Sequence, residues 1–456
     1  MSNTLKVRDD HAPICFEASA EDAGKFKLCE GAEAAWLTQS QTFDIKALRS
    51  RVEPWLTALF QSEHLSLLAG SGLTHAVHHL ATGKPAAGMN EVTLTIYEDA
   101  IRKAAKEAAQ RSGRETGNLE DQLRAANELL RGLEILGNSA EAETLLTELT
   151  STLEDFSKSI LESEAGIARA DEDKREQALN VLVTFLMSFA SRTGVRDRLN
   201  IFTTNYDRLI EAGAELAGLH LLDRFLGNLM PIFRSSRLDL DMHYNPPGIR
   251  GEPRYLEGVA RFTKLHGSVD WVQVDRDIRR VGLPFGADDV APYLQAPGLN
   301  GASAHKLMIY PNAAKDRETS DHPYVELFRD LAAAVCRPNS TLITYGYSFG
   351  DEHINRVIRD MLTVPSTHLV IIAYNDPLGR IMQTYRELGR PSQISLLIGP
   401  ALADLQILTE NFLPKAAIDK TTFRMSELLK QRFGTEAHPG PAAAKPGSDF
   451  DGADLV

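Results

Sequence analysis

Cysteine is scarce in this chain, and its scarcity limits the kinds of site that the chain can build. Only Cys15, Cys29 and Cys336 occur among the 456 residues, an odd number at wide spacing. Three scattered thiols cannot complete a four-thiolate zinc site, and the same spacing predicts no disulfide framework. We therefore assign no metal, and the cysteine usage favours a reducing cytoplasm.

Long apolar runs are also missing. The first residues, MSNTLKVRDDHAPICFEAS, contain acidic side chains and lack the apolar segment of a signal peptide. No later window holds the roughly 20 uninterrupted apolar residues that a membrane span requires. The sequence predicts a soluble, unsecreted protein with no membrane partner.

Basic residues are too few for direct binding of nucleic acid. The formal net charge is -13, whereas neutralising phosphates requires clustered lysine and arginine. The dipeptide at Gly83 and Lys84 is followed by Pro85 and lacks the upstream glycine of a Walker A loop, which excludes an ATP motor. Apolar residues at 43% and charged residues at 24% indicate a soluble globular protein.

The periodicity of apolar residues divides the chain into segments. Residues 43–62 have helical spacing, and the following HLSLLAG is typical of a buried strand that runs into glycines. From about 91 to 195 the chain is rich in Ala, Glu, Leu, Lys and Arg, with apolar positions three and four apart, which predicts an all-helical insertion of about four helices.

Beyond the helical segment, strands that end in polar turns alternate with helices. They lie within RLNIFTTNYD, RFTKLHGSVDW, HKLMIYPNA, STLITYGYSFGDEH and THLVIIAYNDP. This alternation predicts an α/β fold, a Rossmann-like parallel sheet with helices on both faces. The predicted organisation is an N-terminal extension at 1–42, the α/β domain at 43–90 and 196–433, the helical insertion at 91–195, and a disordered acidic tail at 434–456.

Ligands of open parallel sheets bind beyond the carboxyl ends of the strands, where the candidate residues of this chain gather. Gly70, Ser71, Gly72 and Thr74 follow the strand HLSLLA and begin a helix, whose positive end could receive a diphosphate. A tight glycine connection without a ligand is the alternative.

A second polar cluster follows the strand IFT. Asn205 can both donate and accept hydrogen bonds, which suits a ribose hydroxyl or a water molecule. The alternative is that Thr204, Asn205 or Asp207 only caps the next helix.

The segment KLHGS places His266 after another strand. Histidine ordinarily titrates near neutral pH, so His266 could take a proton from a hydroxyl or from water. Gly267 allows the backbone to turn, and Ser268 can form a hydrogen bond nearby. A packed histidine without a catalytic role is the alternative.

Two further strand ends carry polar residues. Gly346, Ser348 and Asp351 join a strand to a helix; Ser348 could contact phosphate, and Asp351 could be only a helix cap. Asn375 could hold a ribose or be a turn residue. The histidines His75, His78 and His79 have no companion ligand pattern and fit a helix surface better than a metal site.

Taken in chain order, GSGLT, TTNYD, KLHGS and GYSFGDEHIN resemble the signature elements of the sirtuin core: a GAGxS loop, a TQNxD segment, a catalytic HG histidine and a GxS loop. The resemblance spans about 64–80 and 198–375. More narrowly, these segments resemble bacterial sirtuin-like NAD hydrolases of anti-phage defence, above all the sirtuin-like subunit that assembles with a HerA-type ATPase.

The resemblance implies a role for each candidate. Asn205 and Asp207 would face the nicotinamide ribose, and His266 would be the general base. Ser348 and Asn375 would lie on the adenosine side. The residues that would hold NAD, the substrate, are Gly70, Ser71, Gly72, Thr74, Thr204, Gly346, Ser348, Asp351 and Asn375.

The sequence also departs from the sirtuin pattern. Thr74 replaces the usual serine, Thr204 replaces glutamine, and HAVHHLATGK has no counterpart of the PDFR element. The four-cysteine zinc module that helps deacylating sirtuins shape their acyl-lysine groove is missing. These departures favour hydrolysis of NAD to ADP-ribose and nicotinamide. NAD-dependent deacylation is the runner-up, and a non-catalytic module that senses NAD or ADP-ribose is the alternative from another class.

The resemblance further implies a cytoplasmic homo-oligomer that docks to a HerA-like ATPase and depletes NAD in abortive infection. An acidic chain without a Walker A loop must leave the sensing of nucleic acid to a partner. The amphipathic helices between 91 and 195 could supply subunit interfaces, or they could only extend the core.

Overall fold

The computed structural model describes residues 2–7, 9–37, 41–111, 115–190, 197–236, 238, 240–244, 254–256, 258–299 and 323–415. The strand predicted within HKLMIYPNA, at 305–313, and the acidic tail predicted at 434–456 lie outside the described residues.

A large, mostly parallel sheet organises the chain. Its strands are β1 (Asn3–Lys6), β2 (Ile14–Ala18), β3 (Phe26–Leu28), β4 (His64–Ala69), β5 (Leu199–Thr203), β6 (His220–Leu222), β11 (Val259–Lys264), β14 (Ser340–Tyr345), β15 (His368–Ala373) and β16 (Ile394–Ile398). They are arranged in the order β3-β2-β1-β16-β15-β14-β4-β5-β11-β6. Every pairing from β16 to β6 is parallel, which confirms the predicted α/β class. The first strands extend the sheet through antiparallel pairing of β1 with β16.

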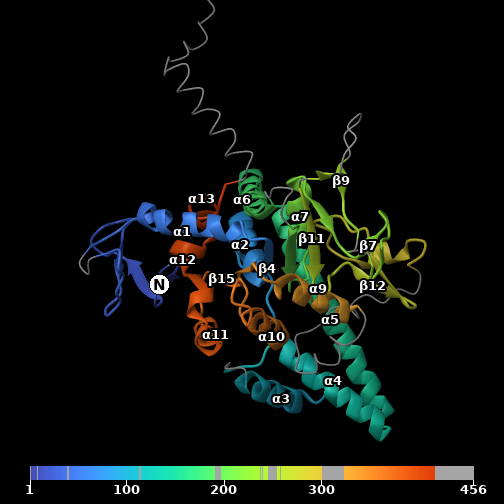
Figure 1. Ribbon diagram of the computed structural model, residues 1–456. Helices are drawn as coiled ribbons and strands as arrows, with labels where there is room; N and C mark the ends of the chain where they lie inside the picture. Colours follow the sequence, from blue (N-terminus) through green and yellow to red (C-terminus); the bar gives the residue numbers. More distant parts are fainter. Residues whose placement is uncertain are drawn as a thin grey trace, which may run out of the picture. The chain divides into compact units, whose positions relative to one another are not determined.

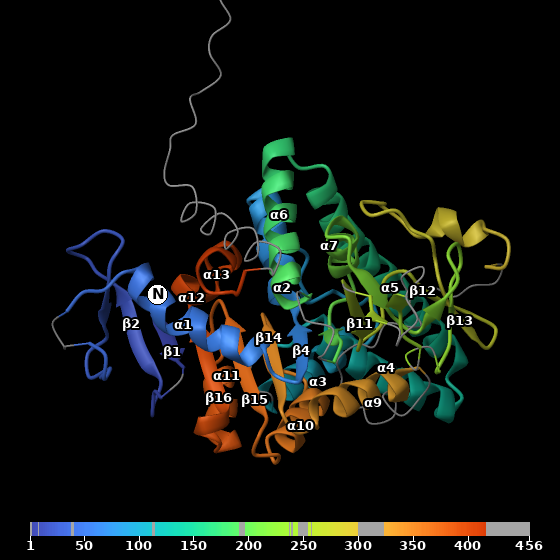
Figure 2. The same cartoon turned by 45° about the horizontal axis from the view of Figure 1, so that its top comes forward.

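Helices cover both faces of the parallel part of the sheet (Figures 1 and 2). On one face lie α1 (Ile45–Phe60), α2 (Ser71–Thr82), α6 (Glu172–Ala190), α7 (Leu209–Leu216), α12 (Pro400–Ala403) and α13 (Leu405–Asn411). On the other lie α9 (Tyr324–Val335), α10 (Glu352–Met361) and α11 (Arg380–Leu388). Side chains of β4 alternate between the two cores, since Leu67 packs into the first and Leu68 into the second. Burial on both faces explains why the parallel strands are rich in apolar residues.

Residues 91–195 contain α3 (Glu98–Arg111), α4 (Leu119–Leu136), α5 (Ser139–Ala168) and α6, in agreement with the four helices that the periodicity predicts. The first three contribute to a third apolar core, which contains Leu123 of α4 and Leu145 of α5 and is completed by residues such as Val269 and Val272 from beyond β11. Helix α6 instead packs on the sheet beside α2, with Leu182 and Phe185 in the sheet's core. The helical segment thus contributes both to a third apolar core and to the cover of the large sheet.

Smaller elements complete the described chain. A four-stranded antiparallel sheet has the order β12-β13-β8-β7, and β9 pairs with β10. The bounds are β7 (Phe225–Leu226), β8 (Ile232–Phe233), β9 (His243–Tyr244), β10 (Arg254–Tyr255), β12 (Trp271–Val274), β13 (Asp277–Arg280), and the 3₁₀ helices η2 (Ala291–Gln295) and η3 (Pro391–Gln393). None of the helices in the described ranges is both long and apolar enough to cross a membrane.

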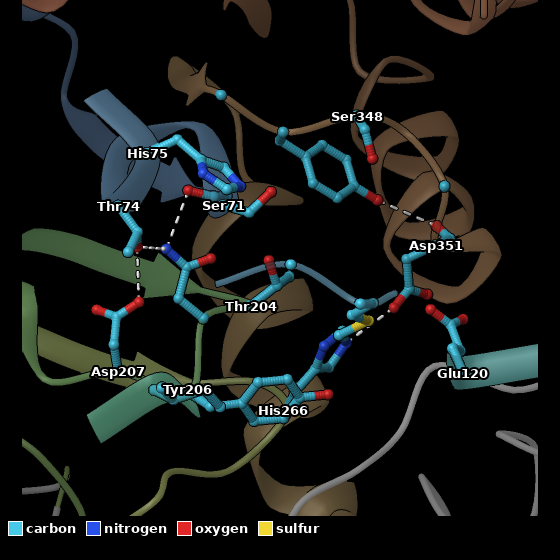
Figure 3. A pocket seen from close by; sticks show the side chains of 18 of the residues that line it. Ser71, Thr74, His75, Glu120, Thr204, Tyr206, Asp207, His266, Ser348 and Asp351 are labelled. Carbon is cyan, nitrogen blue, oxygen red and sulfur yellow. Dashed lines mark hydrogen bonds and ion pairs between the residues drawn. The ribbon is translucent and has the colours of Figure 1, made fainter. Parts of the chain in front are cut away.

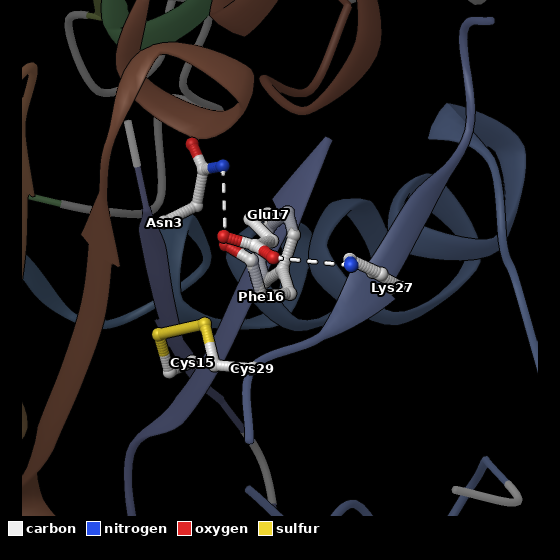
Figure 4. Close-up of a disulfide and its surroundings, with 6 residues drawn as sticks. All are labelled: Asn3, Cys15, Phe16, Glu17, Lys27 and Cys29. Atoms are coloured by element: carbon white, nitrogen blue, oxygen red, sulfur yellow. Dashed lines mark hydrogen bonds and ion pairs between the residues drawn. A yellow bond between two sulfur atoms is a disulfide. The ribbon is translucent and has the colours of Figure 1, made fainter. Parts of the chain in front are cut away.

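A disulfide joins Cys15 of β2 to Cys29, directly after β3 (Figure 4). The prediction that the cysteines form no disulfide is therefore wrong for this pair. The wide spacing of the cysteines in the sequence is no obstacle to this disulfide, because β2 and β3 form an antiparallel hairpin. The hairpin brings the Cα atoms of Cys15 and Cys29 to 5.4 Å despite a sequence separation of 14. That distance lies within the usual range for disulfides.

Candidate functional site

A cavity of about 650 Å³ lies at the carboxyl ends of β4, β5, β11 and β14, which are neighbours in the sheet (Figure 3). Most of the predicted site residues line this cavity: Gly70, Ser71, Thr74, Thr204, Asn205, Asp207, His266, Gly346, Ser348 and Asp351. The parallel topology brings these residues together from segments almost 300 positions apart, and the volume suits a cofactor-sized ligand.

The amino terminus of α2 forms one wall of the cavity. Gly70 is its N-cap, and within the described chain no side chain caps this helix end. The helix dipole therefore presents a positive end to the cavity, which suits a phosphate group.

Glycine is required where this wall meets the loop after β14. A Cβ atom on Gly70 would lie 2.5 Å from the Gly346 carbonyl oxygen, and one on Gly72 would lie 2.6 Å from the Gly346 Cα. Gly72 therefore packs against the Gly346 backbone and does not line the cavity, although the resemblance assigns it to the diphosphate. Because Gly72 has no side chain, the start of α2 and the loop after β14 can approach each other closely.

Asn205 lies at the centre of a hydrogen-bond cluster at the end of β5. Its Nδ2 donates to the Gly70 carbonyl oxygen at 3.0 Å and to Thr74 Oγ1 at 2.9 Å. Thr74 Oγ1 in turn donates to Asp207 Oδ2 at 2.6 Å. Both Nδ2 hydrogens are therefore engaged, so the amide group has a fixed orientation in the cavity wall.

The helix-cap alternative applies to Asp207 and not to Asn205. Asp207 Oδ1 accepts a hydrogen bond from the Leu209 amide at 3.0 Å, at the start of α7, while its other oxygen holds Thr74. One carboxylate thus both caps a helix and orients the Asn205 cluster.

His266 forms a buried pair with Asp351 across the cavity. His266 Nε2 lies 2.8 Å from Asp351 Oδ2, and the two side chains are 4% and 5% exposed. Asp351 is also the N-cap of α10, with Oδ1 accepting from the His353 amide at 3.0 Å. Asp351 is therefore a helix cap that also lines the cavity. Its carboxylate fixes the imidazole ring and stabilises the positive charge that the ring gains when it takes a proton.

Charged residues that the sequence did not single out also line the cavity. Glu120 and Arg124 come from α4, while Arg356 and Arg380 come from α10 and α11. The pattern around each of them is that of an ordinary helix surface. Only the fold, which sets α4 and α5 against the strand ends, shows that they belong to the site.

A buried ion pair supports the cavity from behind Asp207. Arg208 donates to both carboxylate oxygens of Glu164, a residue of α5, and the two side chains are 7% and 2% exposed. Burial raises the pKa of Glu164, whereas the charge of Arg208 opposes that rise. This pair links the helical segment directly to the segment that carries Asn205 and Asp207.

His75 of α2 also lines the cavity, and burial is the main cause that lowers its pKa, with the neighbouring His78 adding to the effect. Within the ranges that the structure describes, no group of His, Cys, Asp or Glu is arranged to hold a metal ion.

Asn375 does not join the other predicted residues. It follows β15, is exposed, and lies outside the set that lines the cavity. Strand β15 ends at the same edge of the sheet as β14 but lies one strand further from the centre of the site.

Comparison with known families gives this arrangement a context. Residues 199–389 match the family model of the SIR2-like domain. This part of the chain is therefore similar to the SIR2-like domain. No curated protein matches the chain. The matched SIR2-like region contains Asn205, His266 and Asp351, whereas β4 and α2 precede it. The structure adds Gly70, Ser71 and Thr74 to the same cavity from outside that region.

Proposed function

We propose that this protein hydrolyses the nicotinamide–ribose bond of NAD, yielding ADP-ribose and nicotinamide. The observation that carries the proposal is the buried His266–Asp351 pair, which faces the Asn205 cluster across a cavity that also receives the positive end of α2. The match to the SIR2-like domain supports NAD as the substrate class.

The donors and acceptors in the cavity fit the chemistry of a dinucleotide. The uncapped start of α2, with Ser71, suits a diphosphate, and Ser348 of the facing loop adds a hydroxyl group. The Asn205 side-chain oxygen and the oriented Asp207 carboxylate suit a ribose, because its hydroxyls both donate and accept hydrogen bonds.

Hydrolysis requires the carbon–nitrogen bond to break with its electron pair leaving on nicotinamide, so positive charge develops on the ribose. The carboxylates of Asp207 and Asp351 and the fixed dipole of Asn205, which all line the cavity, would stabilise such charge. A water oxygen then bonds to the ribose carbon, and His266 takes the proton from that water, directly or through a ribose hydroxyl. The proton passes to solvent, which completes the cycle.

The activity is tested by measuring nicotinamide and ADP-ribose released by the purified chain. We expect His266→Ala to lower turnover by roughly a hundredfold to ten-thousandfold, the usual contribution of a positioned acid–base group. Asn205→Ala should also lower turnover, because the side-chain amide that orients the ribose or the water is lost. The matched control is His64→Ala, because His64 pairs with Asp197 at 3.0 Å at the opposite end of β4. Folded His266→Ala and Asn205→Ala variants with wild-type turnover would contradict the proposal.

We also propose that NAD hydrolysis serves anti-phage defence in the cytoplasm, with the chain acting as a homo-oligomer bound to a HerA-like ATPase. The resemblance and the net charge of -13, which leaves nucleic-acid sensing to a partner, support this role. Ile135, Leu136 and Leu146, near the turn between α4 and α5, are 71%, 75% and 52% exposed and offer an apolar contact surface. Native mass spectrometry, with and without such an ATPase, tests the assembly; a monomer that never associates would count against it.

A further inference from the structure

A buried lysine lies directly behind the candidate site. Lys264 is the last residue of β11, two positions before His266, and it is only 3% exposed. It does not line the cavity, so it does not contact a ligand there. Because a buried ammonium group is destabilising unless it is paired and hydrogen-bonded, the surroundings of Lys264 show what it holds.

The Lys264 ammonium group donates its hydrogen bonds to the neighbouring strand end. Nζ donates to the carbonyl oxygens of Tyr206, at 3.5 Å, and of Asp207. Its remaining contact is with Glu211 Oε1 of α7, at 3.1 Å, which supplies the opposite charge. The lysine therefore bridges the segment that carries Asn205 and Asp207 to the helix that follows.

This segment has no regular backbone pairing of its own. Strand β5 ends at Thr203 and α7 begins at Leu209, so the carbonyl groups between them need other donors. Besides Lys264, Ser268 Oγ donates to the Tyr206 carbonyl oxygen at 3.2 Å, and the Val269 amide donates to it at 3.1 Å. All these donors come from β11 or the turn that follows it, the same piece of chain that carries His266.

We infer that Lys264 is a positioning residue, which holds the Asn205–Asp207 segment at a fixed distance from His266. The inference rests on the proposed NAD hydrolysis. Strands β5 and β11 pair in parallel with Thr203 opposite Lys264, so the two catalytic segments leave the sheet side by side. The charged bridge then fixes their spacing beyond the last sheet hydrogen bond. A displacement of about 1 Å in such a site costs on the order of a hundredfold in rate.

The test compares Lys264→Met with the double variant Lys264→Met/Glu211→Met. The double variant removes both charges, and replacing a buried ion pair with apolar residues often preserves stability, whereas the single variant leaves Glu211 without its partner. We expect kcat for NAD to fall by about a hundredfold in both, with KM changing by less than about threefold, because the alignment of the reacting groups is lost and most ligand contacts remain. The matched control is Arg224→Met/Asp330→Met, which removes a buried pair with a 2.6 Å contact between the β6–β7 turn and α9.

A purely structural role for Lys264 predicts that a folded double variant retains a wild-type kcat, and this result would overturn the inference. Should Lys264→Met fail to fold, the double variant alone decides. Hydrogen exchange supplies a measurement that needs no turnover: amides of residues 204–208 should exchange faster in the double variant than in the control. Unchanged exchange there would also overturn the inference. Wild-type protein that never releases nicotinamide would contradict the proposed function, and the exchange result would still decide whether Lys264 holds the segment.

Discussion

The pairing of His266 with Asp351 makes a quantitative prediction for Asp351→Asn. Asparagine is as good an N-cap as aspartate, so α10 keeps its start and the variant should fold. What is lost is the charge on the oxygen that lies 2.8 Å from His266 Nε2. A hydrogen bond to a charged group contributes about 1.5–3 kcal/mol. If this hydrogen bond stabilises the transition state in which His266 becomes positively charged, its loss lowers kcat for NAD by about 10- to 150-fold.

The assay measures nicotinamide release under saturating NAD, together with the thermal midpoint of unfolding. The matched control is Asp376→Asn, because Asp376 caps the start of α11 by accepting from the Ile381 and Met382 amides and does not line the cavity. We expect both variants to keep their thermal midpoints and only Asp351→Asn to lose turnover. A folded Asp351→Asn protein with kcat within about twofold of wild type would refute the assignment of Asp351 to the chemistry.

Three further predictions concern stability. Burial raises the pKa of Glu211 from 4.5 to about 7, and the charge of Lys264 opposes this rise. Between these pH values the folded state therefore binds more protons than the unfolded state, so the free energy of unfolding falls as pH rises from 4.5 to 7. Denaturant titrations should show that wild type loses about 3 kcal/mol more unfolding free energy than Glu211→Gln between pH 4.5 and 7. The same pH dependence of unfolding free energy in both proteins would exclude this titration of Glu211. A Gly70→Ala variant should lose stability and turnover, since its Cβ would lie 2.5 Å from the Gly346 carbonyl oxygen. The control Gly132→Ala in α4, whose Cβ meets no atom within 4 Å, should gain about 0.5–1 kcal/mol of unfolding free energy. Equal thermal midpoints for the two variants would contradict the close-packing argument. Under oxidising conditions, the Cys15→Ser/Cys29→Ser variant should have about 3 kcal/mol less unfolding free energy than wild type, the loop-closure value for a separation of 14 residues. Equal stability of variant and wild type under these conditions would show that the disulfide does not form.

The parts of the site that the sequence predicted are those attached to regular strands. Asn205 and His266 each follow a predicted strand, and parallel pairing of β5 with β11 brings the ends of these strands together. The same reasoning did not show that Asn375 lies outside the residues that line the cavity, because no local sequence pattern gives the order of strands in the sheet. Gly72 was assigned to the ligand for its position in a glycine turn, yet a neighbouring loop explains it equally well.

Other parts depend on contacts between distant segments. The partner of His266 is 85 positions away, and as a sequence signal Asp351 is indistinguishable from any helix cap. Glu120 and Arg124 look like solvent-facing residues of an amphipathic helix until α4 is placed beside the strand ends. The disulfide was missed because the local sequence does not show which residues of β2 and β3 lie opposite each other.

The order of strands across the sheet also bears on how the chain is made. Strand β4 pairs with β14, about 270 positions later, and β1 pairs with β16, so neither partner exists until most of the polypeptide has left the ribosome. Loop closure over such separations is slow compared with local helix formation. The cavity needs Gly70, Asn205, His266 and Asp351 in place together. If the protein hydrolyses NAD as proposed, incomplete chains should therefore be unable to consume NAD, and a growing cell would be protected during synthesis without a dedicated inhibitor.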